Sequence, residues 1–324
     1  MTNLTGISNW KLTVQRENER IMILRASTCD TSAVLPDELF GLPVTALSDR
    51  ALSPSAGEIE GETLLLCSGR AQDGWDNGKL QELTVPESVT EIGSYAFYNC
   101  RSLRTLHLTD SVCRLGAEAF MNCRAFHTLE LKRKKDTGST LLSDIVSSLP
   151  QELDVTVLPE GAESFRLLFP EYYELHTENS PAHHFDYTIE GSGYPYHHVF
   201  RNKVLHLSDY DSLWQDLLKG EYDIPTALRL SWYRLRYPKD LADRAKEAYT
   251  AFVGDHLASA LALCLREEDL QGLQLLLTMP AITAEDLSSA LEVSRQAGFT
   301  AATALLLEKE HRMLSAGRRR DYTL

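Results

Sequence analysis

The sequence is short of positive charge. Its 324 residues include 32 Lys and Arg against 46 Asp and Glu, which gives a formal net charge of −14. Proteins bind a phosphate backbone largely through Lys and Arg, and no stripe of such residues runs through the first half of the chain. We therefore expect no nucleic-acid partner, and we interpret the short basic runs at 132–135 and 318–320 as solvated charge.

Long apolar runs and paired cysteines are also missing. No stretch approaches the roughly 18 apolar residues that a membrane span needs, and the opening MTNLTGISNWKLTVQ lacks the pattern of a secretory signal. The six cysteines include no Cys-x-x-Cys pair, so neither a disulfide framework nor a zinc site is indicated. These absences predict a cytoplasmic protein with free thiols and no membrane span.

The motifs that usually carry catalysis are absent as well. The sequence contains no His-Glu-x-x-His, no nucleophile elbow and no Walker-type phosphate loop. The Gly-Ser-Gly at 191–193 does not follow a dinucleotide-binding pattern, and we interpret it as a hairpin turn. The sequence therefore predicts a protein that is not an enzyme, with no cofactor and no catalytic residue to name.

What the sequence does contain is a repeat. EIGSYAFYNC at 91–100 returns as RLGAEAFMNC at 114–123, twenty-three positions later, and a third unit starts at Phe126. A fixed period of about 20 to 50 residues is typical of a solenoid, in which each unit buries its apolar edge against the next. The repetition therefore predicts stacked coils.

Each repeat unit contains a predicted strand, a glycine and an Ala-Phe pair in the same order. Leu-x-x-Leu-x-Leu predicts a short strand with alternate side chains pointing inward, and Gly93 and Gly116 give the backbone room before the Ala-Phe pair. The phenylalanines should form one internal ladder. Cys100 and Cys123 occupy equivalent positions, where we expect buried thiols that act as small hydrophobes.

Over residues 80–131 this spacing closely resembles the BspA-like, or Treponema-type, leucine-rich repeat of bacteria. Residues 34–52 are similar to a divergent first unit, in which Leu52 replaces the usual Phe. The resemblance implies an α/β solenoid of short parallel strands that presents a sheet to ligands. It also implies that relatives act as surface or secreted adhesins, so an adhesin exported by a non-classical route is one alternative function.

The remainder of the first half fits a closed solenoid, and we place its domain at 1–158. NWKLTVQ and RIMILR predict an N-terminal β-hairpin cap, and turn-rich residues 54–79 predict an insertion in which ETLLLC forms an extra strand. STLLSDIVSSLP then predicts a short helix and ELDVTVLP a further strand.

The second half is different in character. Residues 159–208 form an aromatic and His-rich connecting segment, and 209–324 show apolar residues at helical spacing, which predicts an all-α domain. The sequence pattern that starts at Leu257 is repeated from Leu287, an offset of thirty residues, which predicts two stacked helical hairpins. AGFTAATALLLEKE resembles part of an ankyrin repeat, although the Thr-Pro-Leu-His signature is absent.

The predicted function is binding. The repeat register places seven polar side chains on the outward face of the strands and so predicts that they contact an unknown protein partner: Glu82, Thr84, Thr105, His107, Thr128, Glu130 and Lys132. Because the set includes no aromatic anchor, we expect modest affinity. A non-catalytic scaffold is therefore the primary hypothesis.

A metal-dependent enzyme is the alternative from another class. Four histidines lie close together in the sequence as potential metal ligands, in the pairs His183–His184 and His197–His198. Neighbouring residues on a strand point to opposite faces, so each pair could give only one ligand to a shared site. The spacing matches no standard metal motif, and structural histidines are the favoured interpretation.

Overall fold

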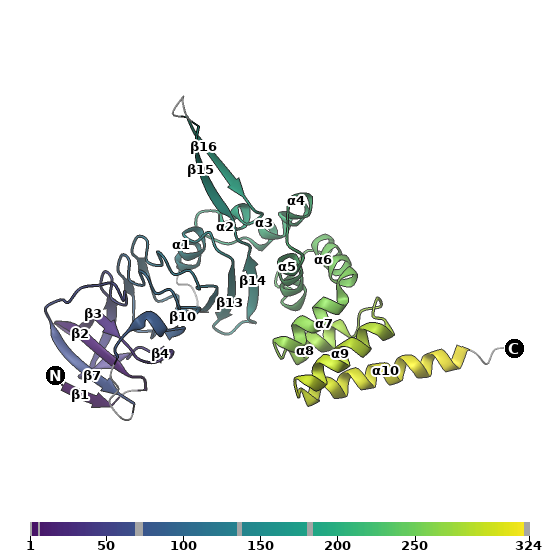
Figure 1. Cartoon of the computed structure of the whole chain (residues 1–324), viewed down its shortest axis with the longest axis horizontal. Coiled ribbons are helices and arrows are strands. Elements are labelled where there is room, and N and C mark those ends of the chain that lie inside the picture. Colours follow the sequence, from purple (N-terminus) through teal and green to yellow (C-terminus); the bar gives the residue numbers. More distant parts are fainter. Residues whose placement is uncertain (1, 6, 69–73, 135–137, 180–183, 321–324) are drawn as a thin grey trace. The chain divides into compact units, whose positions relative to one another are not determined.

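The structure is a computed structural model that describes residues 2–5, 7–68, 74–134, 138–179 and 184–320. It forms two compact units, Met1–Tyr222 and Asp223–Leu324 (Figure 1). The first unit is a solenoid with its cap and the connecting segment, and the second is helical. The fold class predicted from the sequence is therefore confirmed, while the finer boundaries at residues 158 and 208 stay a prediction.

The predicted N-terminal hairpin is present. β2 (Trp10–Glu17) and β3 (Arg20–Ser27) pair antiparallel, and Trp10, Leu12 and Val14 point inward by strict alternation. The predicted extra strand is β7 (Glu62–Cys67), which pairs antiparallel with β2 and parallel with β1 (Thr2–Thr5). Residues of the predicted insertion thus complete the cap sheet.

The repeats form two rows of parallel strands. One row carries β4 (Ser32–Val34), β8 (Glu82–Thr84), β10 (Thr105–Thr109), β12 (Thr128–Arg133) and β13 (Leu153–Pro159), with β14 (Phe165–Phe169) antiparallel at its end. The other carries β6 (Leu42–Leu47), β9 (Glu91–Ile92) and β11 (Arg114–Leu115), and β5 (Glu38–Leu39) pairs with β6. A 3-10 turn at Asn77–Lys79 and helix α1 (Leu141–Ser147) connect coils.

The interior of the coils contains the predicted phenylalanine ladder. The ring of Phe97 stacks on that of Phe120 with centroids 5.0 Å apart, and Phe120 stacks on Phe126 at 5.2 Å. Beside the ladder, the thiol of Cys100 donates to the carbonyl of Leu52, and that of Cys123 to the carbonyl of Phe97. Each thiol thus bonds to the preceding coil, which supports the structural role predicted for these cysteines.

The cysteines should differ sharply in reactivity. Burial raises the pKa of Cys123 to about 12 and that of Cys100 well above its usual range, so both stay protonated and inert. Cys113 is exposed. In native protein treated with a chromogenic disulfide reagent at pH 8, we expect Cys113 to react first, and Cys100 and Cys123 only after unfolding. Fast labelling of Cys123 in folded protein would contradict the ladder.

The connecting segment predicted at 159–208 contains β14 and then a two-stranded hairpin of β15 (Tyr173–Asn179) and β16 (His184–Glu190). Helices α2 (Tyr194–His197), α3 (Leu207–Ser212) and α4 (Trp214–Lys219) follow. The hairpin turn predicted at 191–193 is wrong, because these residues connect β16 to α2. Glycine is required at Gly193 for another reason: a Cβ there would overlap the carbonyl oxygen of Pro170.

The second unit consists of helical hairpins. α5 (Ile224–Arg236) and α6 (Asp243–Asp255) pack together and precede α7 (Leu257–Arg266), α8 (Leu270–Leu276), α9 (Ala284–Gln296) and α10 (Thr300–Arg320). α7 contacts both α8 and α9, and α9 contacts α10, which is the predicted stack. Asp223 caps α5, and Thr283 and Asp286 form a capping box on α9.

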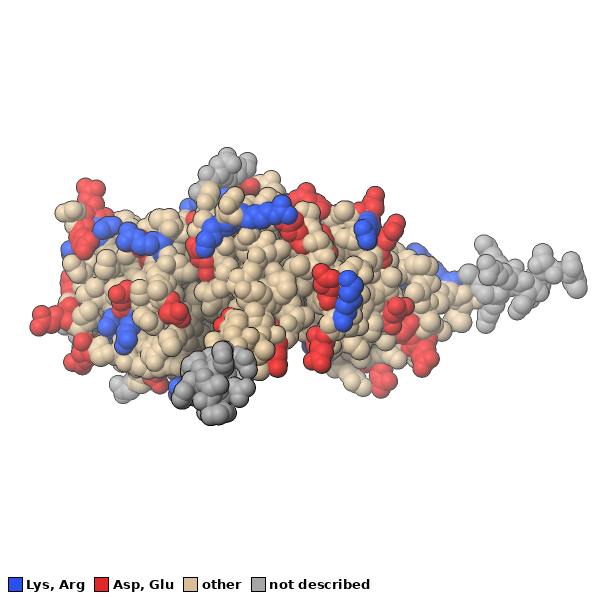
Figure 2. All heavy atoms as spheres, turned by 90° about the horizontal axis from the view of Figure 1, so that it is seen from above, with Lys and Arg blue, Asp and Glu red and all other residues tan. Residues whose placement is uncertain are grey.

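Surface charge and helix length add two observations. On the face that Figure 2 shows, Asp and Glu side chains are interspersed with Lys and Arg side chains. Within the described ranges, no single helix is long and apolar enough to cross a membrane. α6 and α7 meet those criteria only as a pair bent by 90°.

Candidate functional site

The seven side chains predicted for binding come from three neighbouring strands of one row. Thr105 on β10 aligns with Glu82 on β8 and Thr128 on β12, and His107 aligns with Thr84 and Glu130. Lys132 is exposed, and the other six are partly exposed between buried neighbours such as Leu106 and Leu129. The strand alternation thus puts all seven on the outward side, because the inward positions are the buried leucines.

His107 lies at the centre of this face, between two carboxylates. Its Nε2 is 2.8 Å from Glu82 Oε1, and its Nδ1 is 3.3 Å from Glu130 Oε1. Both carboxylates reach the ring from neighbouring strands, as diagonal and direct cross-strand neighbours can. Donation to both at once requires a proton on each ring nitrogen. We call Glu82, His107 and Glu130 the carboxylate–histidine cluster.

Glu82 has a second donor. The hydroxyl of Ser32 on β4 donates to Glu82 Oε2 at 3.0 Å. The hydrogen bond from His107, and after it that from Ser32, lowers the pKa of Glu82. Glu82 is therefore held as a carboxylate with both oxygens engaged, which fixes the side chain on the face.

A small hollow of about 220 Å³ lies at one end of these strands. Thr84, His107, Glu130 and Lys132 line it, together with Glu87. Lys134 Nζ is 3.4 Å from Glu87 Oε2 across its edge. The outward face is therefore concave at this point as well as polar.

Several residues of this face were not predicted. Ser32 aligns with Glu82, and Asp154 on β13 aligns with Thr128, so the polar row extends one strand in each direction. Arg166 on β14 donates to both carboxylate oxygens of Asp154. The predicted strand ELDVTVLP was the signal that could have placed Asp154, whereas Ser32 precedes the first repeat unit predicted at 34–52.

The histidine pairs are arranged differently from a metal site. His183 lies outside the described residues, and His184 begins β16. His197 is buried on α2, where Nδ1 is 2.9 Å from the carbonyl of Val146 and Nε2 2.8 Å from that of Pro170. Both ring nitrogens thus lie within hydrogen-bond distance of backbone carbonyls, and the neutral ring, which carries one N–H, donates to one of the two at a time. The exposed His198 directly follows α2, and its Nδ1 is 2.9 Å from the carbonyl oxygen of Tyr194.

Two further observations bear on chemistry at the histidines. Burial lowers the pKa of His197, although the carbonyls of Val146 and Pro170 act in the opposite direction. Over the described part of the chain, no group of three or more His, Cys, Asp or Glu residues could hold a metal ion. His197 is therefore a buried link between Val146 on α1 and Pro170, which directly follows β14.

Comparison with known proteins identifies the repeats. Residues 72–144 match the family described as BspA type Leucine rich repeat region (6 copies). No curated protein matches the chain. A solved Leucine Rich Repeat protein of T. pallidum is similar over 39% of this chain and 74% of that one, at 20% identity and a TM-score of 0.22. The ankyrin resemblance of the helical unit stays a prediction. The repeat segment at 72–144, with its stacked strands and phenylalanine ladder, is a BspA-type leucine-rich repeat region.

Proposed function

We propose that the chain is a non-catalytic binding protein that contacts a protein partner through the outward face of β8, β10 and β12. Stacked repeats generally present extended surfaces for binding. The observation that carries the proposal is the carboxylate–histidine cluster, which is ordered across three strands on an accessible face. No buried core requires it there, so a role at the surface accounts for it best.

The chemistry of this face favours a polar partner surface. Glu82, Glu130 and Glu87 offer acceptor oxygens, and Thr105 and Thr128 offer small hydroxyls that allow close approach. Partner Lys or Arg groups fit such acceptors. Because the face has no aromatic anchor, we propose a dissociation constant in the micromolar range, on the order of 1–100 μM.

The test changes the cluster without removing its bulk. Glu82→Gln, His107→Gln and Glu130→Gln are combined in the full chain, which is used as bait in lysate of its native cells. We expect the captured partner to fall at least about tenfold, a loss of roughly 1.4 kcal/mol. The control is Glu91→Gln with Arg114→Gln, an ion pair of 2.8 Å on the other row of strands.

Capture of the same partner by the cluster variant and the control variant would contradict the proposal. Thermal unfolding of both variants separates lost binding from lost folding. The cluster is largely at the surface, so each variant should melt within a few degrees of the parent.

We also propose the helical unit as a second contact surface. Leu275 on α8, Val293 on α9 and Leu307 on α10 are exposed although apolar. Exposed apolar groups on neighbouring helices favour a protein contact. Changing all three to Ser should weaken partner capture if this surface takes part. Unchanged capture would restrict binding to the solenoid.

A further inference from the structure

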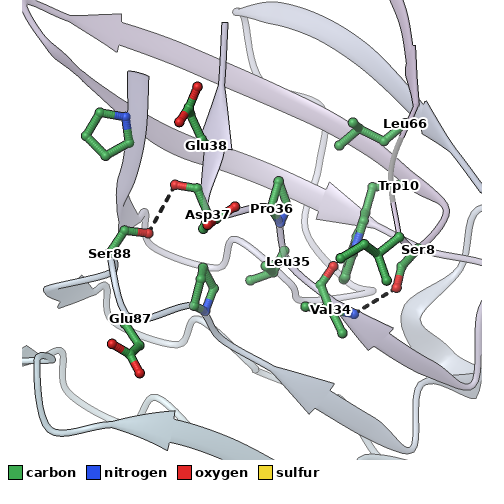
Figure 3. A pocket seen from close by; sticks show the side chains of 13 residues that line it. Ser8, Trp10, Val34, Leu35, Pro36, Asp37, Glu38, Leu66, Glu87 and Ser88 are labelled. Carbon is green, nitrogen blue, oxygen red and sulfur yellow. Dashed lines mark hydrogen bonds between the residues drawn. The ribbon is translucent and has the colours of Figure 1, made fainter. Parts of the chain in front are cut away.

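A second hollow lies at the junction of the cap and the first coils. It shares Glu87 with the hollow on the sheet face, but none of Glu82, His107 and Glu130 lines it. It has a volume of about 690 Å³ and is open to solvent. Binding clefts commonly measure about 300 to 1,000 Å³, so it is large enough for several side chains of a ligand. We call it the cap groove. Figure 3 shows Trp10 and Leu66 at one end and Asp37, Glu38 and Glu87 at the other.

One end of the cap groove is apolar. Trp10 and Leu66 come from the cap strands β2 and β7, and Leu35 follows β4. All three are packed in the core and show only an edge to the groove. Ile7 adds an apolar side chain that is 84% exposed. A ligand that covers both Ile7 and the apolar floor removes a large apolar surface from water, which favours binding.

The other end is acidic. Asp37 and Glu38 are exposed, and Glu87 lines the same rim. Lys134 lies 3.4 Å from Glu87, whereas the described residues around Asp37 and Glu38 supply no ion pair to either carboxylate. No Lys or Arg lines the cap groove. The rim therefore presents two carboxylates without a counter-charge on a chain whose net charge is already −14.

The groove does not accept a ligand by strand addition at Val34. The outer edge of β4 is already closed, since the indole of Trp10 donates to the Val34 carbonyl at 2.8 Å. The hydroxyl of Ser8 accepts from the Val34 N–H at 2.9 Å. A ligand is therefore recognised here through its side chains rather than by pairing with this strand.

We propose that the cap groove binds an extended peptide segment of a protein partner, with an aliphatic or aromatic side chain against Trp10, Leu66 and Ile7 and a Lys or Arg side chain at Asp37 and Glu38. Charge complementarity decides the occupant. An acidic ligand meets only carboxylates at the rim, and a second copy of this acidic chain would bring like charge to it. This site shares Glu87 with the hollow on the sheet face. The residues proposed to hold the ligand here lie outside the carboxylate–histidine cluster, so the proposal does not depend on the sheet-face contact.

The test uses the full chain and an array of ten-residue peptides. In one set, Leu or Phe positions and Lys or Arg positions vary. The matched set carries Glu in place of every Lys and Arg. Peptides that combine an apolar residue with a nearby basic residue should bind, and their Glu counterparts should not. The variant of the full chain with Asp37→Asn and Glu38→Gln should bind a selected peptide roughly tenfold more weakly, because two rim ion pairs with the peptide are lost.

Controls separate this site from the rest of the chain. Asp243→Asn with Glu247→Gln removes two exposed carboxylates from α6 and should leave binding unchanged. The cluster variant Glu82→Gln, His107→Gln, Glu130→Gln should also bind as the parent does, so failure here and failure of the sheet-face proposal are distinguishable. Ile7→Ser should weaken binding, which separates a groove contact from attraction by net charge alone.

Several results would overturn the proposal. One is equal binding of basic and acidic peptides, and another is equal weakening by the rim and α6 variants. Absence of any peptide that binds above background would have the same consequence. Concentration-dependent dimerisation that the rim variant abolishes would show that a second copy, not a peptide segment, occupies the groove.

Discussion

Gly116→Ala is expected to destabilise the solenoid by about 3–5 kcal/mol, because an added Cβ would meet backbone rather than a movable side chain. The new atom would overlap the amide nitrogen of Ser94 and the carbonyl carbon of Gly93 on the preceding coil. The N–H of Gly116 already bonds the carbonyl of Ile92 at 2.7 Å, which holds the two coils together at this point. Relief of the overlap therefore requires the coils to move apart.

Calorimetric unfolding of the full chain measures this effect. A loss of that size should lower the melting temperature of the first unit by roughly 10 °C, since about 2–4 °C corresponds to each kcal/mol at 150–250 residues. Gly57→Ala is the matched control, because a Cβ there has no heavy atom within 4 Å. A Gly116 variant that melts with the Gly57 variant would show that the coils do not approach this closely.

His197→Ala is expected to destabilise the first unit by about 2–4 kcal/mol. The change leaves a cavity and removes the ring that joins the carbonyls of Val146 and Pro170. It also removes edge contacts with Phe169 and Tyr172. His198→Ala is the control, because that ring is exposed and should contribute less than about 1 kcal/mol.

The same residue makes stability depend on pH. Burial lowers the pKa of His197 in the folded chain below the unfolded value of 6.5. As pH falls below about 6.5, the unfolded chain binds a proton that the folded chain does not, so the free energy of unfolding decreases. Above this range the contribution is fully present.

His197→Gln tests the linkage directly. The difference in free energy of unfolding between parent and variant should shrink as the pH is lowered from 7.5 to about 5.5, with most of the change below 6.5, because only in the parent does the unfolded chain bind a proton that the folded chain does not. A difference that stays constant over this range would show that His197 is not held neutral by burial.

The sequence predicted the regular parts of the fold because each coil repeats the same contacts. Phe97 and Phe120 occupy the same position in successive units, so stacking is the way both can be buried. Gly93 and Gly116 recur where one coil meets the previous one, and a Cβ on Gly93 would lie 2.5 Å from Asp49 N. Ser48 takes the equivalent place in the first coil, which packs on the cap instead.

The parts that the sequence did not predict depend on contacts between distant segments. The cap groove brings together Trp10 of β2, Leu66 of β7 and Leu35, which follows β4, and no local sequence pattern predicts this arrangement. The turn at 191–193 was misplaced because glycine is required at Gly193 by the close approach of the Pro170 carbonyl, twenty-three residues earlier, and not by a local turn. The seven face residues could be placed by alternation alone, but the contacts of His107 with both carboxylates required the structure.

The most direct test of the central proposal is site-specific photocrosslinking from the outward face of the strands. A benzophenone amino acid replaces Thr105 on β10 in the full chain, and in a second variant it replaces Glu91 on the other row. After irradiation in native cells, the proposal predicts a crosslinked partner protein from position 105, absent from position 91 and lost when Glu82, His107 and Glu130 are changed to Gln. A partner that crosslinks from position 91 alone, or one that persists at position 105 in the cluster variant, would contradict it.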